Sequence, residues 1–360
     1  MDPRTQKLAK LVVGYSVFVK PSEVVVISGS TEAQEFMVAL YKEVILAGGH
    51  PVLRVNLPGL TPFFYKYAKK HQIERFPKEF DFMVKNAQKY IGIYSSSNTK
   101  ELTNCDPKKM TGRDKITHII SDYIVNEKDK ISRCTVGFPC IALAQEAEMD
   151  LVEYENFAYN ATIGVDYKKL GKLMDKILAR FRKGKKVHLI GEGVDLKFLI
   201  HGNMAAMCNG EENMPDGEVF MAPVRESLNG WIKFEYPAIR DGKEVTGVFL
   251  RFEKGKVIES RADKNEDFLK EMLATDENSS YVGEFGIGMN PKINKFTKNL
   301  LFDEKIGGTI HLALGMAYKE NLPKGETRDS AIHWDIVKDM KKAKIILDDK
   351  VVQENGVWKI

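Results

Sequence analysis

The first half of the chain alternates short apolar runs with segments whose apolar residues recur at helical spacing. Residues 23–28 form a β-branched run typical of a buried strand. Residues 31–34 predict a capping box that opens a helix, and the apolar face of this helix consists of Phe36, Met37, Leu40, Val44 and Ile45. Gly48-Gly49 ends the helix, and residues 51–55 and 90–94 are further predicted strands. Strands that alternate with helices favour an α/β domain with a mostly parallel, doubly wound sheet.

The second half has a different pattern, in which strands follow one another with few helices between them. A short helix is expected at residues 268–273, and the tail forms a last meander with Asn355-Gly356 as a turn. Strands are predicted at residues 187–190, 245–252, 257–260, 308–315 and 331–337. This pattern indicates an α+β domain with a mixed or antiparallel sheet.

A basic helix at residues 167–182 and the Lys-rich segment that follows it separate the two patterns. We therefore place an N-terminal α/β domain at residues 1–185 and a C-terminal α+β domain at residues 186–360. The Lys and Arg residues at positions 168–186 predict a solvated helix face and a linker, because Phe181 is the only aromatic residue in that stretch and one ring is too little for a stacking platform.

The charge balance argues against two classes of partner. The chain has 54 Lys and Arg against 50 Asp and Glu, a net charge of +4, which is too even to predict nucleic-acid or membrane-surface binding. No apolar run approaches the roughly 20 residues that span a bilayer. The N-terminus does not resemble a signal peptide, and Cys105, Cys134, Cys140 and Cys208 match no disulfide framework. We expect a cytoplasmic protein with reduced, mostly buried thiols.

The glycine and nucleophile motifs of common enzyme classes are missing. Gly283-Glu-Phe-Gly286-Ile-Gly288 has the wrong spacing for a dinucleotide fingerprint, and Asn290-Pro291 interrupts any following helix. The sequence also lacks a phosphate loop, a Gly-x-Ser-x-Gly elbow and a His-Glu-x-x-His helix. These absences argue against NAD, ATP and covalent hydrolysis.

Five side chains in the second half form a candidate metal-ligand set. His333 and Asp335 lie two apart on a predicted strand and so share a face. The others are Glu218, Glu284 and His311. Taken singly, each has a plain structural explanation, such as a turn carboxylate, a core histidine or a local hydrogen-bonded pair. Together they exceed a tetrahedral zinc site and fit two divalent ions that share a carboxylate.

Four segments in this half resemble the family of thermophilic metallo-aminopeptidases of the aminopeptidase T and aminopeptidase S type. The resemblance runs over nearly the whole chain and is most specific in the second half. The segments are Asn213-Met-Pro-Asp-Gly-Glu-Val219, Gly283-Glu-Phe-Gly-Ile-Gly-Met-Asn-Pro291, Asp303-Glu-Lys-Ile-Gly-Gly-Thr-Ile-His-Leu-Ala-Leu-Gly315 and Ser330-Ala-Ile-His-Trp-Asp335.

The resemblance implies a two-domain exopeptidase, usually a homodimer, that acts on short peptides with two divalent ions such as zinc, cobalt or manganese. The same five residues match the family's metal ligands. Tyr318 matches a tyrosine near the reacting carbonyl, and Glu304 matches a catalytic carboxylate. Glu284 or Glu304 would be the general base, and Asp335 is our preferred bridging ligand because a carboxylate has two oxygens.

Two other functions remain open. Ring-cleaving dihydroxypyridine dioxygenases resemble the same scaffold, and a single iron needs only two histidines and one carboxylate. Glu218 as an extra ligand favours two ions and hydrolysis instead. The chain could also be an inactive peptide-binding homologue, although all five ligand positions are filled.

Overall fold

The computed structural model describes residues 1–240 and 242–359, and its residue contacts divide the chain into two compact units. Unit 1 consists of Met1–Gly164 and Gly210–Pro215. Unit 2 consists of Val165–Asn209 and the described part of Asp216–Ile360, so it includes the basic helix. Within the described residues, no helix is both long and apolar enough to cross a membrane.

Unit 1 is built on a five-stranded parallel sheet with the order β2-β1-β3-β4-β8. Consecutive β-branched residues Val25, Val26 and Ile27 are fully buried, as a strand covered on both faces requires. The predicted parallel sheet is therefore confirmed. Its strands are β1 (Val24–Ser30), β2 (His50–Asn56), β3 (Lys89–Tyr94), β4 (Ser132–Gly137) and β8 (Asn213–Met214).

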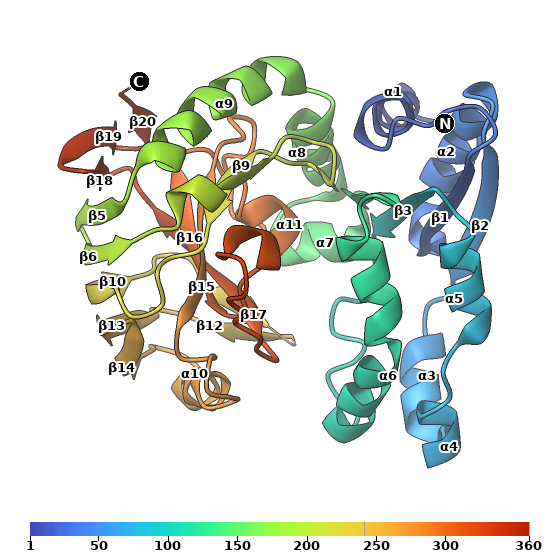
Figure 1. Ribbon diagram of the computed structural model, residues 1–360. Helices are drawn as coiled ribbons and strands as arrows, with labels where there is room; N and C mark the ends of the chain where they lie inside the picture. The colour runs from blue at the N-terminus through green and yellow to red at the C-terminus, as the bar shows by residue number, and fades with distance from the viewer. Residues whose placement is uncertain (241, 360) are drawn as a thin grey trace. The chain divides into compact units, whose positions relative to one another are not determined.

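Helices cover this sheet (Figure 1). Val26 of β1 packs with Val84 of α5 and Ile120 of α6, while α2 contacts β1 and β2. The helices are α1 (Pro3–Leu11), α2 (Gln34–Leu46), α3 (Leu60–Tyr67), α4 (Lys70–Ile73), α5 (Lys78–Lys85), α6 (Pro107–Asn126), α7 (Ile141–Glu146) and α8 (Leu151–Thr162), with a π-helical turn η1 at Val12–Ser16.

The start of α2 differs from the sequence prediction, whereas its end agrees. Thr31–Ala33 form a 3-10 turn, η2, directly after β1, so α2 begins at Gln34 with Ala33 as its N-cap and no side chain caps it. The capping-box prediction is wrong, because the tight turn out of the strand places Thr31 inside the turn. Gly48 adopts φ 82°, the left-handed conformation that ends a helix, as predicted.

Unit 2 contains an eight-stranded antiparallel sheet with the order β14-β13-β10-β6-β5-β18-β19-β20. The antiparallel pair of β13 and β14 and the predicted C-terminal meander both belong to it. Its strands are β5 (Lys186–Gly191), β6 (Val194–Leu199), β10 (Asn229–Lys233), β13 (Phe249–Glu253), β14 (Lys256–Arg261), β18 (Ala343–Leu347), β19 (Lys350–Glu354) and β20 (Val357–Trp358).

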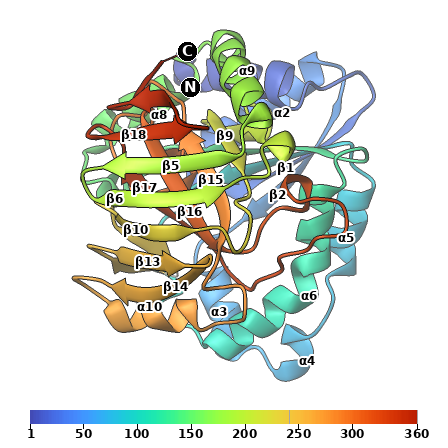
Figure 2. The ribbon, with the colours of Figure 1, turned by 60° about the vertical axis from the view of Figure 1, so that its left-hand side comes forward.

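A second antiparallel sheet of unit 2, with the order β17-β16-β15-β9-β7, contains the candidate ligands. One face packs on the eight-stranded sheet, which lies in front of it in Figure 2, and Phe285 of β15 meets Phe198 of β6 at a centroid distance of 5.2 Å. The α+β prediction is confirmed. The strands are β7 (Ala206–Cys208), β9 (Glu218–Met221), β15 (Val282–Gly288), β16 (Thr309–Gly315) and β17 (His333–Asp339).

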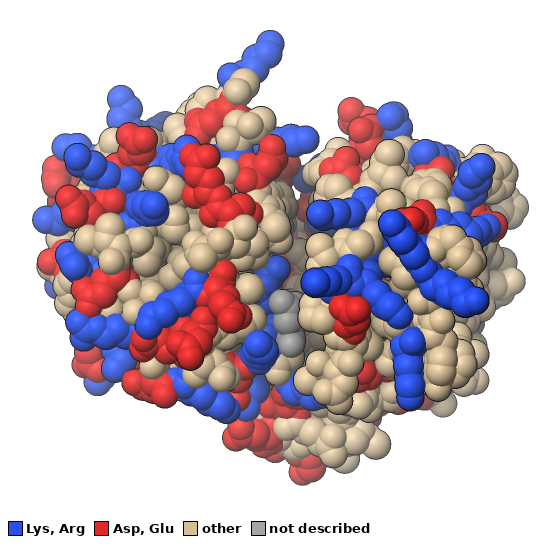
Figure 3. Space-filling model, turned by 90° about the horizontal axis from the view of Figure 1, so that it is seen from below, with Lys and Arg blue, Asp and Glu red and all other residues tan. Residues whose placement is uncertain are grey.

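The remaining elements of unit 2 are short, apart from the basic helix α9 (Tyr167–Lys183). Leu170, Met174 and Phe181 of α9 are buried while its lysines and arginines are exposed, as predicted for a solvated face. Figure 3 shows the molecule from below relative to Figure 1, and acidic and basic side chains are interspersed on that face. The other elements are α10 (Glu266–Leu273), α11 (Leu300–Asp303), the pair β11 (Ala238–Arg240) and β12 (Lys243–Val245), and the turns η3 (Gly202–Met204) and η4 (Lys319–Asn321).

Candidate metal centre

Strand register places all five predicted ligands on one face of the five-stranded sheet of unit 2. Cross-strand partners in an antiparallel ladder point to the same side, and side chains two apart on a strand do the same. Ala313 of β16 pairs with Glu284 on one side and with Asp335 on the other. The remaining three follow from the pairs Gly286↔His311, Gly288↔Glu218 and Gly315↔His333.

Small residues on this face leave room between the candidate ligands. A Cβ atom on Gly286 would lie 1.9 Å from Nε2 of His311, and a Cβ atom on Gly288 would lie 2.2 Å from the carbonyl oxygen of Ile306. Only glycine fits at these two positions while His311 and the Ile306 backbone keep their places. Gly286 of β15 therefore makes room for an imidazole and Gly288 for the backbone at Ile306, whereas the sequence alone showed only that this spacing was not a nucleotide fingerprint.

The side chains converge on the imidazole of His311. Its Nε2 lies 3.2 Å from Oε1 of Glu284, 3.6 Å from Oε2 of Glu218 and 4.0 Å from Oδ1 of Asp335. Asp335 directs its other oxygen, Oδ2, toward Nε2 of His333 at 3.6 Å. The side chains of four residues are buried: Glu218, Glu284, His311 and Asp335. The side chain of His333 is half-buried.

Several buried polar atoms of this cluster lack a hydrogen-bond partner among the described residues: Oε2 of Glu218, Oε2 of Glu284, Oδ1 of Asp335 and Nδ1 of His311. An unsatisfied buried polar group costs about 1–3 kcal/mol, and more when it is charged. Three carboxylates and two imidazoles are a donor set for borderline divalent cations. The residues present therefore fit a divalent metal, whose coordination would satisfy the unpartnered oxygens.

His333 has the support that a metal-binding histidine usually has. Its Nδ1 lies 2.9 Å from the carbonyl oxygen of Met316. Because a carbonyl oxygen only accepts, Nδ1 carries the hydrogen, and the lone pair of the neutral ring is on Nε2, facing Asp335. The Met316 carbonyl thus selects the tautomer that can bind a cation.

The crowded carboxylates shift the ionisation of the cluster. Burial raises the pKa of Glu218 to about 8 and also raises that of Asp335. Burial lowers the pKa of His311, but Glu284, Asp335 and Glu218 outweigh it and raise the pKa to about 9. For Glu284, the opposing effect of burial is exceeded by the hydrogen bond to His311 and by the histidine charges, so its pKa is lowered. The site thus favours positive charge next to its carboxylates.

Glu304 and Lys305 adjoin the cluster at the end of α11. Oxygens of Glu304 and Glu218 and a nitrogen of His311 lie within 4.8 Å of one another, as do ligand atoms of Glu284, His311 and Asp335. The ammonium of Lys305 donates to Oε1 of Glu218 at 2.6 Å and also to Oε1 of Glu304. Lys305 was not predicted as a site residue, although it directly follows Glu304 in the Asp-Glu-Lys motif.

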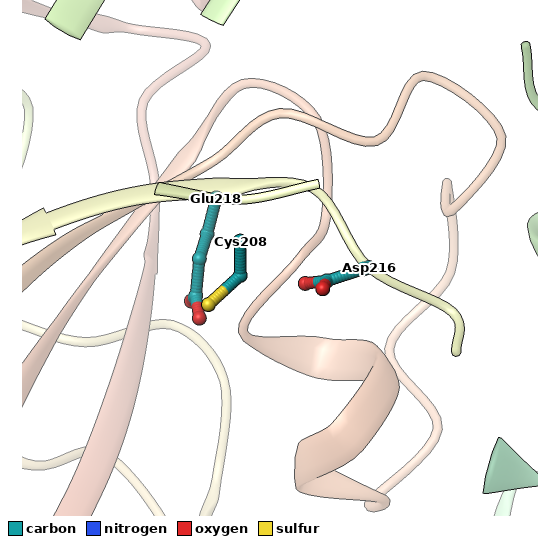
Figure 4. A group of neighbouring side chains, drawn as sticks. All are labelled: Cys208, Asp216 and Glu218. Carbon is teal, nitrogen blue, oxygen red and sulfur yellow. The ribbon is translucent and has the colours of Figure 1, made fainter. Parts of the chain in front are cut away.

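Cys208 and Asp216 also lie beside Glu218 and were not predicted. Figure 4 shows the thiol of Cys208 and the carboxylates of Asp216 and Glu218 near one another, and their ligand atoms lie within 4.8 Å. Cys208 pairs with Glu218 across β7 and β9. Their spacing in the sequence carries no metal motif, so only the pairing of two short strands brings them together.

Tyr318 lies next to His333, with a distance of 5.1 Å between ring centroids. The phenol is half-buried, and burial together with the nearby carboxylates raises its pKa well above the usual value. The hydroxyl therefore keeps its hydrogen at neutral pH and can donate it. This places a neutral donor at the edge of the carboxylate cluster.

Comparison with protein families and curated proteins places this geometry in context. The chain matches the family model described as thermophilic metalloprotease (M29) over residues 1–358. Aminopeptidase AmpS of Bacillus subtilis (strain 168) is 28% identical in an alignment 417 residues long, and this alignment covers 99% of this chain and 100% of the relative. Aminopeptidase T of Thermus thermophilus is 34% identical over 180 residues, 43% of each chain.

Two solved structures share the fold. Wild-type AmpT from Thermus thermophilus superposes with a TM-score of 0.85 at 22% identity, covering 99% of both chains. A 2,5-dihydroxypyridine dioxygenase from Pseudomonas putida KT2440 superposes with a TM-score of 0.61 at 12% identity, covering 98% of this chain and 96% of that one. At these identities the two superpositions establish the fold alone.

Proposed function

We propose that the buried carboxylate–histidine cluster of this chain releases N-terminal residues from short peptides. This proposal starts from the fact that the chain belongs to the family of thermophilic metalloproteases (M29). The full-length similarity to a named aminopeptidase agrees with the family match, and the chain is a metallo-aminopeptidase, a hydrolase. The observation that carries the role of this site is its set of buried, unpartnered ligand atoms within the described residues, on Glu218, Glu284 and Asp335.

We assign the five residues Glu218, Glu284, His311, His333 and Asp335 as ligands of two divalent ions, zinc, cobalt or manganese. The two oxygens of Asp335 face different histidines, Oδ1 toward His311 and Oδ2 toward His333. Asp335 would be the shared ligand if two ions bind, because each of its oxygens could serve one of them. A single imidazole nitrogen cannot do so.

The ions, when bound, supply Lewis acidity that acidifies water and polarises the peptide carbonyl. The chain's own groups supply the proton transfers. Glu284 or Glu304 takes a proton from the attacking water and returns it to the leaving amine. The hydroxyl of Tyr318 donates a hydrogen bond to the oxyanion, which its raised pKa permits at neutral pH.

Separate substitutions distinguish the two carboxylates. Oε1 of Glu284 contacts His311 and its Oε2 has no partner in the described structure, which supports our assignment of Glu284 as a ligand. Glu304 is half-buried and is held by Lys305. We expect Glu304→Gln to retain metal and lose kcat by about 10²-fold or more, and Glu284→Gln to lose both metal and activity. If Glu304→Gln keeps full kcat, Glu304 is not the base.

The decisive experiment measures metal content and hydrolysis together. Elemental analysis of the purified chain should give about two ions per chain, and hydrolysis of leucine amide should disappear with a chelator and return with zinc, cobalt or manganese. N-acetyl-leucine amide is the matched control, since an exopeptidase that binds the free amine should not cleave it. One iron per chain without hydrolysis would favour a ring-cleaving dioxygenase. Absence of metal after reloading would exclude the site.

The assembly is a separate proposal. We expect a homodimer, and analytical ultracentrifugation of the full chain tests it. A single species at the monomer mass across micromolar concentrations would contradict this expectation.

A further inference from the structure

We propose that Lys305 is a positioning residue of this site: its buried ammonium holds one oxygen of Glu218 and one of Glu304, so that Glu218 presents its other oxygen to the metal position. This inference rests on the proposed function. It adds a residue that neither binds the ion nor touches the substrate. Lys305 acts instead through Glu218, a proposed ligand, and through Glu304, the proposed base.

The first observation is the burial of the ammonium. The side chain of Lys305 is 1% exposed and donates from Nζ to Oε1 of Glu218 at 2.6 Å and to Oε1 of Glu304. A charged group this deeply buried is stable only when oppositely charged partners are arranged around it. Backbone hydrogen bonds fix the position from which the Lys305 side chain extends. The Lys305 N–H donates to the carbonyl oxygen of Phe302, and the Lys305 carbonyl oxygen accepts from the N–H of Asn290, both at 3.0 Å.

The second observation is that the two carboxylate oxygens of Glu218 have different surroundings. Oε1 is engaged by Lys305, whereas Oε2 has no hydrogen-bond partner among the described residues and lies 3.6 Å from Nε2 of His311. A free carboxylate could rotate and offer either oxygen or both. With Oε1 held, the geometry assigns Oε2 as the single donor atom of Glu218.

The same ammonium also fixes Glu304 relative to Glu218. One Nζ bonds an oxygen of each, so the proposed base and a proposed ligand share one point of attachment. Glu304 is half-buried and follows a four-residue helix, so its backbone alone does not set the carboxylate's direction. Loss of the ammonium would release both carboxylates at once.

Lys305 also accounts for the neighbouring group of Cys208, Asp216 and Glu218, whose composition resembles a metal site (Figure 4). The buried ammonium of Lys305 lies 2.6 Å from Oε1 of Glu218, which is one of the three members of this group. We take the ammonium as the cation of this group. Cys208→Ser should therefore leave the number of bound ions unchanged, and loss of an ion would overturn this assignment.

Another lysine provides a matched control for the general effect of removing a buried charge. Lys338 of β17 is fully buried, and its Nζ lies 2.6 Å from Oε1 of Glu235 and 3.0 Å from the carbonyl oxygen of Lys233. It is three residues from Asp335 and so points to the opposite face of the sheet. Lys338→Met removes a buried ammonium and leaves the candidate ligands untouched.

The test compares Lys305→Met and Lys338→Met in the full chain. Calorimetric titration of the metal-free proteins with zinc or manganese should show affinity reduced by about 10- to 100-fold in Lys305→Met. Its kcat should fall with little change in KM, because the base is misplaced while peptide contacts remain. Lys338→Met should melt earlier but bind metal as the wild type does. Lys305→Arg should recover most of the affinity, since it restores charge and donors.

The outcomes separate the two proposals. A wild type that binds no metal and hydrolyses nothing removes the proposed function itself. A wild type that does both, with Lys305→Met unchanged in affinity and kcat, overturns only the role of Lys305, as does an equal loss of affinity in Lys338→Met. If Lys305→Met does not fold by circular dichroism, Lys305→Gln takes its place, and wild-type affinity in that variant overturns the inference.

Discussion

At the residue scale, Tyr318 is the group whose chemistry separates catalysis from metal binding. Its hydroxyl keeps its hydrogen at neutral pH, and its ring lies beside His333 but does not belong to the proposed ligand set. Tyr318→Phe should lower kcat by about 10²- to 10³-fold, the usual effect of removing an oxyanion donor, while metal content stays at the wild-type level. Steady-state kinetics with parallel elemental analysis tests this. A variant that loses its metal would show that Tyr318 supports the ligands instead.

Gly286 is the second residue whose replacement has a definite expectation. An added methyl group would overlap His311, because the Cβ position lies 1.9 Å from Nε2. Gly286→Ala should therefore displace the imidazole, destabilise the protein by about 1–3 kcal/mol and weaken metal binding. Gly14→Ala is the control, since no atom outside its own helical turn lies within 4 Å of that Cβ position. Thermal melting and metal titration measure both effects, and wild-type behaviour of Gly286→Ala would contradict the packing argument.

The sequence allowed the candidate ligands to be chosen by residue type, but it did not reveal the residues that surround them. His333 and Asp335 carry their own signal, because a spacing of two on a strand places them on one face. Lys305 carries none, since a lysine in an Asp-Glu-Lys run normally lies in solvent, yet its side chain is 1% exposed. Burial of a charged residue depends on distant strands, and local composition cannot report it.

At the scale of elements, Asp276 joins the loop after α10 to the segment that enters β17. Its carboxylate accepts hydrogen bonds from the backbone of Asn278, Ser279 and Ala331 and from the hydroxyl of Ser330. Ser330 and Ala331 lead directly to His333. These hydrogen bonds to Asp276, which we call the Asp276 clamp, therefore set where β17 begins. They thereby also set the position of the two candidate ligands on that strand.

The ionisation of Asp276 makes this clamp dependent on pH. Burial raises its pKa, but the hydrogen bonds from Ala331, Ser330, Asn278 and Ser279 outweigh burial and lower it below the ordinary value of 3.8. The carboxylate thus stabilises the fold above about pH 4, and this contribution is lost as the pH falls through the lowered pKa. Asp276→Asn should cost about 1 kcal/mol near pH 7, with a smaller difference from wild type in acid. A pH-independent difference in melting temperature would contradict the ionic clamp.

Element prediction succeeded where a strand is long and regular in composition. The β-branched run of β1 and the Asn355-Gly356 turn between β19 and β20 both appear as expected. Short strands escaped prediction, because β7, β8 and β9 have four residues or fewer, and β9 is buried throughout so that no alternation marks it. The candidate site depends on one of these, since Glu218 begins β9.

At the scale of the whole molecule, metal removal should affect the two units differently. The candidate ligands come from four strands of unit 2, so a bound ion would cross-link β9, β15, β16 and β17. At a metal concentration about 100 times the Kd, the stabilisation is about 2.7 kcal/mol. Hydrogen exchange with and without a chelator should show protection lost in these strands and retained in β1, β3 and β4 of unit 1. Equal loss in both sheets would contradict a site confined to unit 2.

The path of the chain between β7 and β9 has a consequence for synthesis on the ribosome. The chain leaves unit 2 after Asn209, supplies Gly210–Pro215 to unit 1, including strand β8, and returns at Asp216. When Gly164 emerges from the exit tunnel, the parallel sheet still lacks its fifth strand, and β4 has an open edge. That strand arrives only after α9, β5, β6 and β7 have been translated. The nascent protein therefore cannot complete its first unit before beginning its second, and Glu218 is synthesised within a few residues of the strand that closes the first sheet.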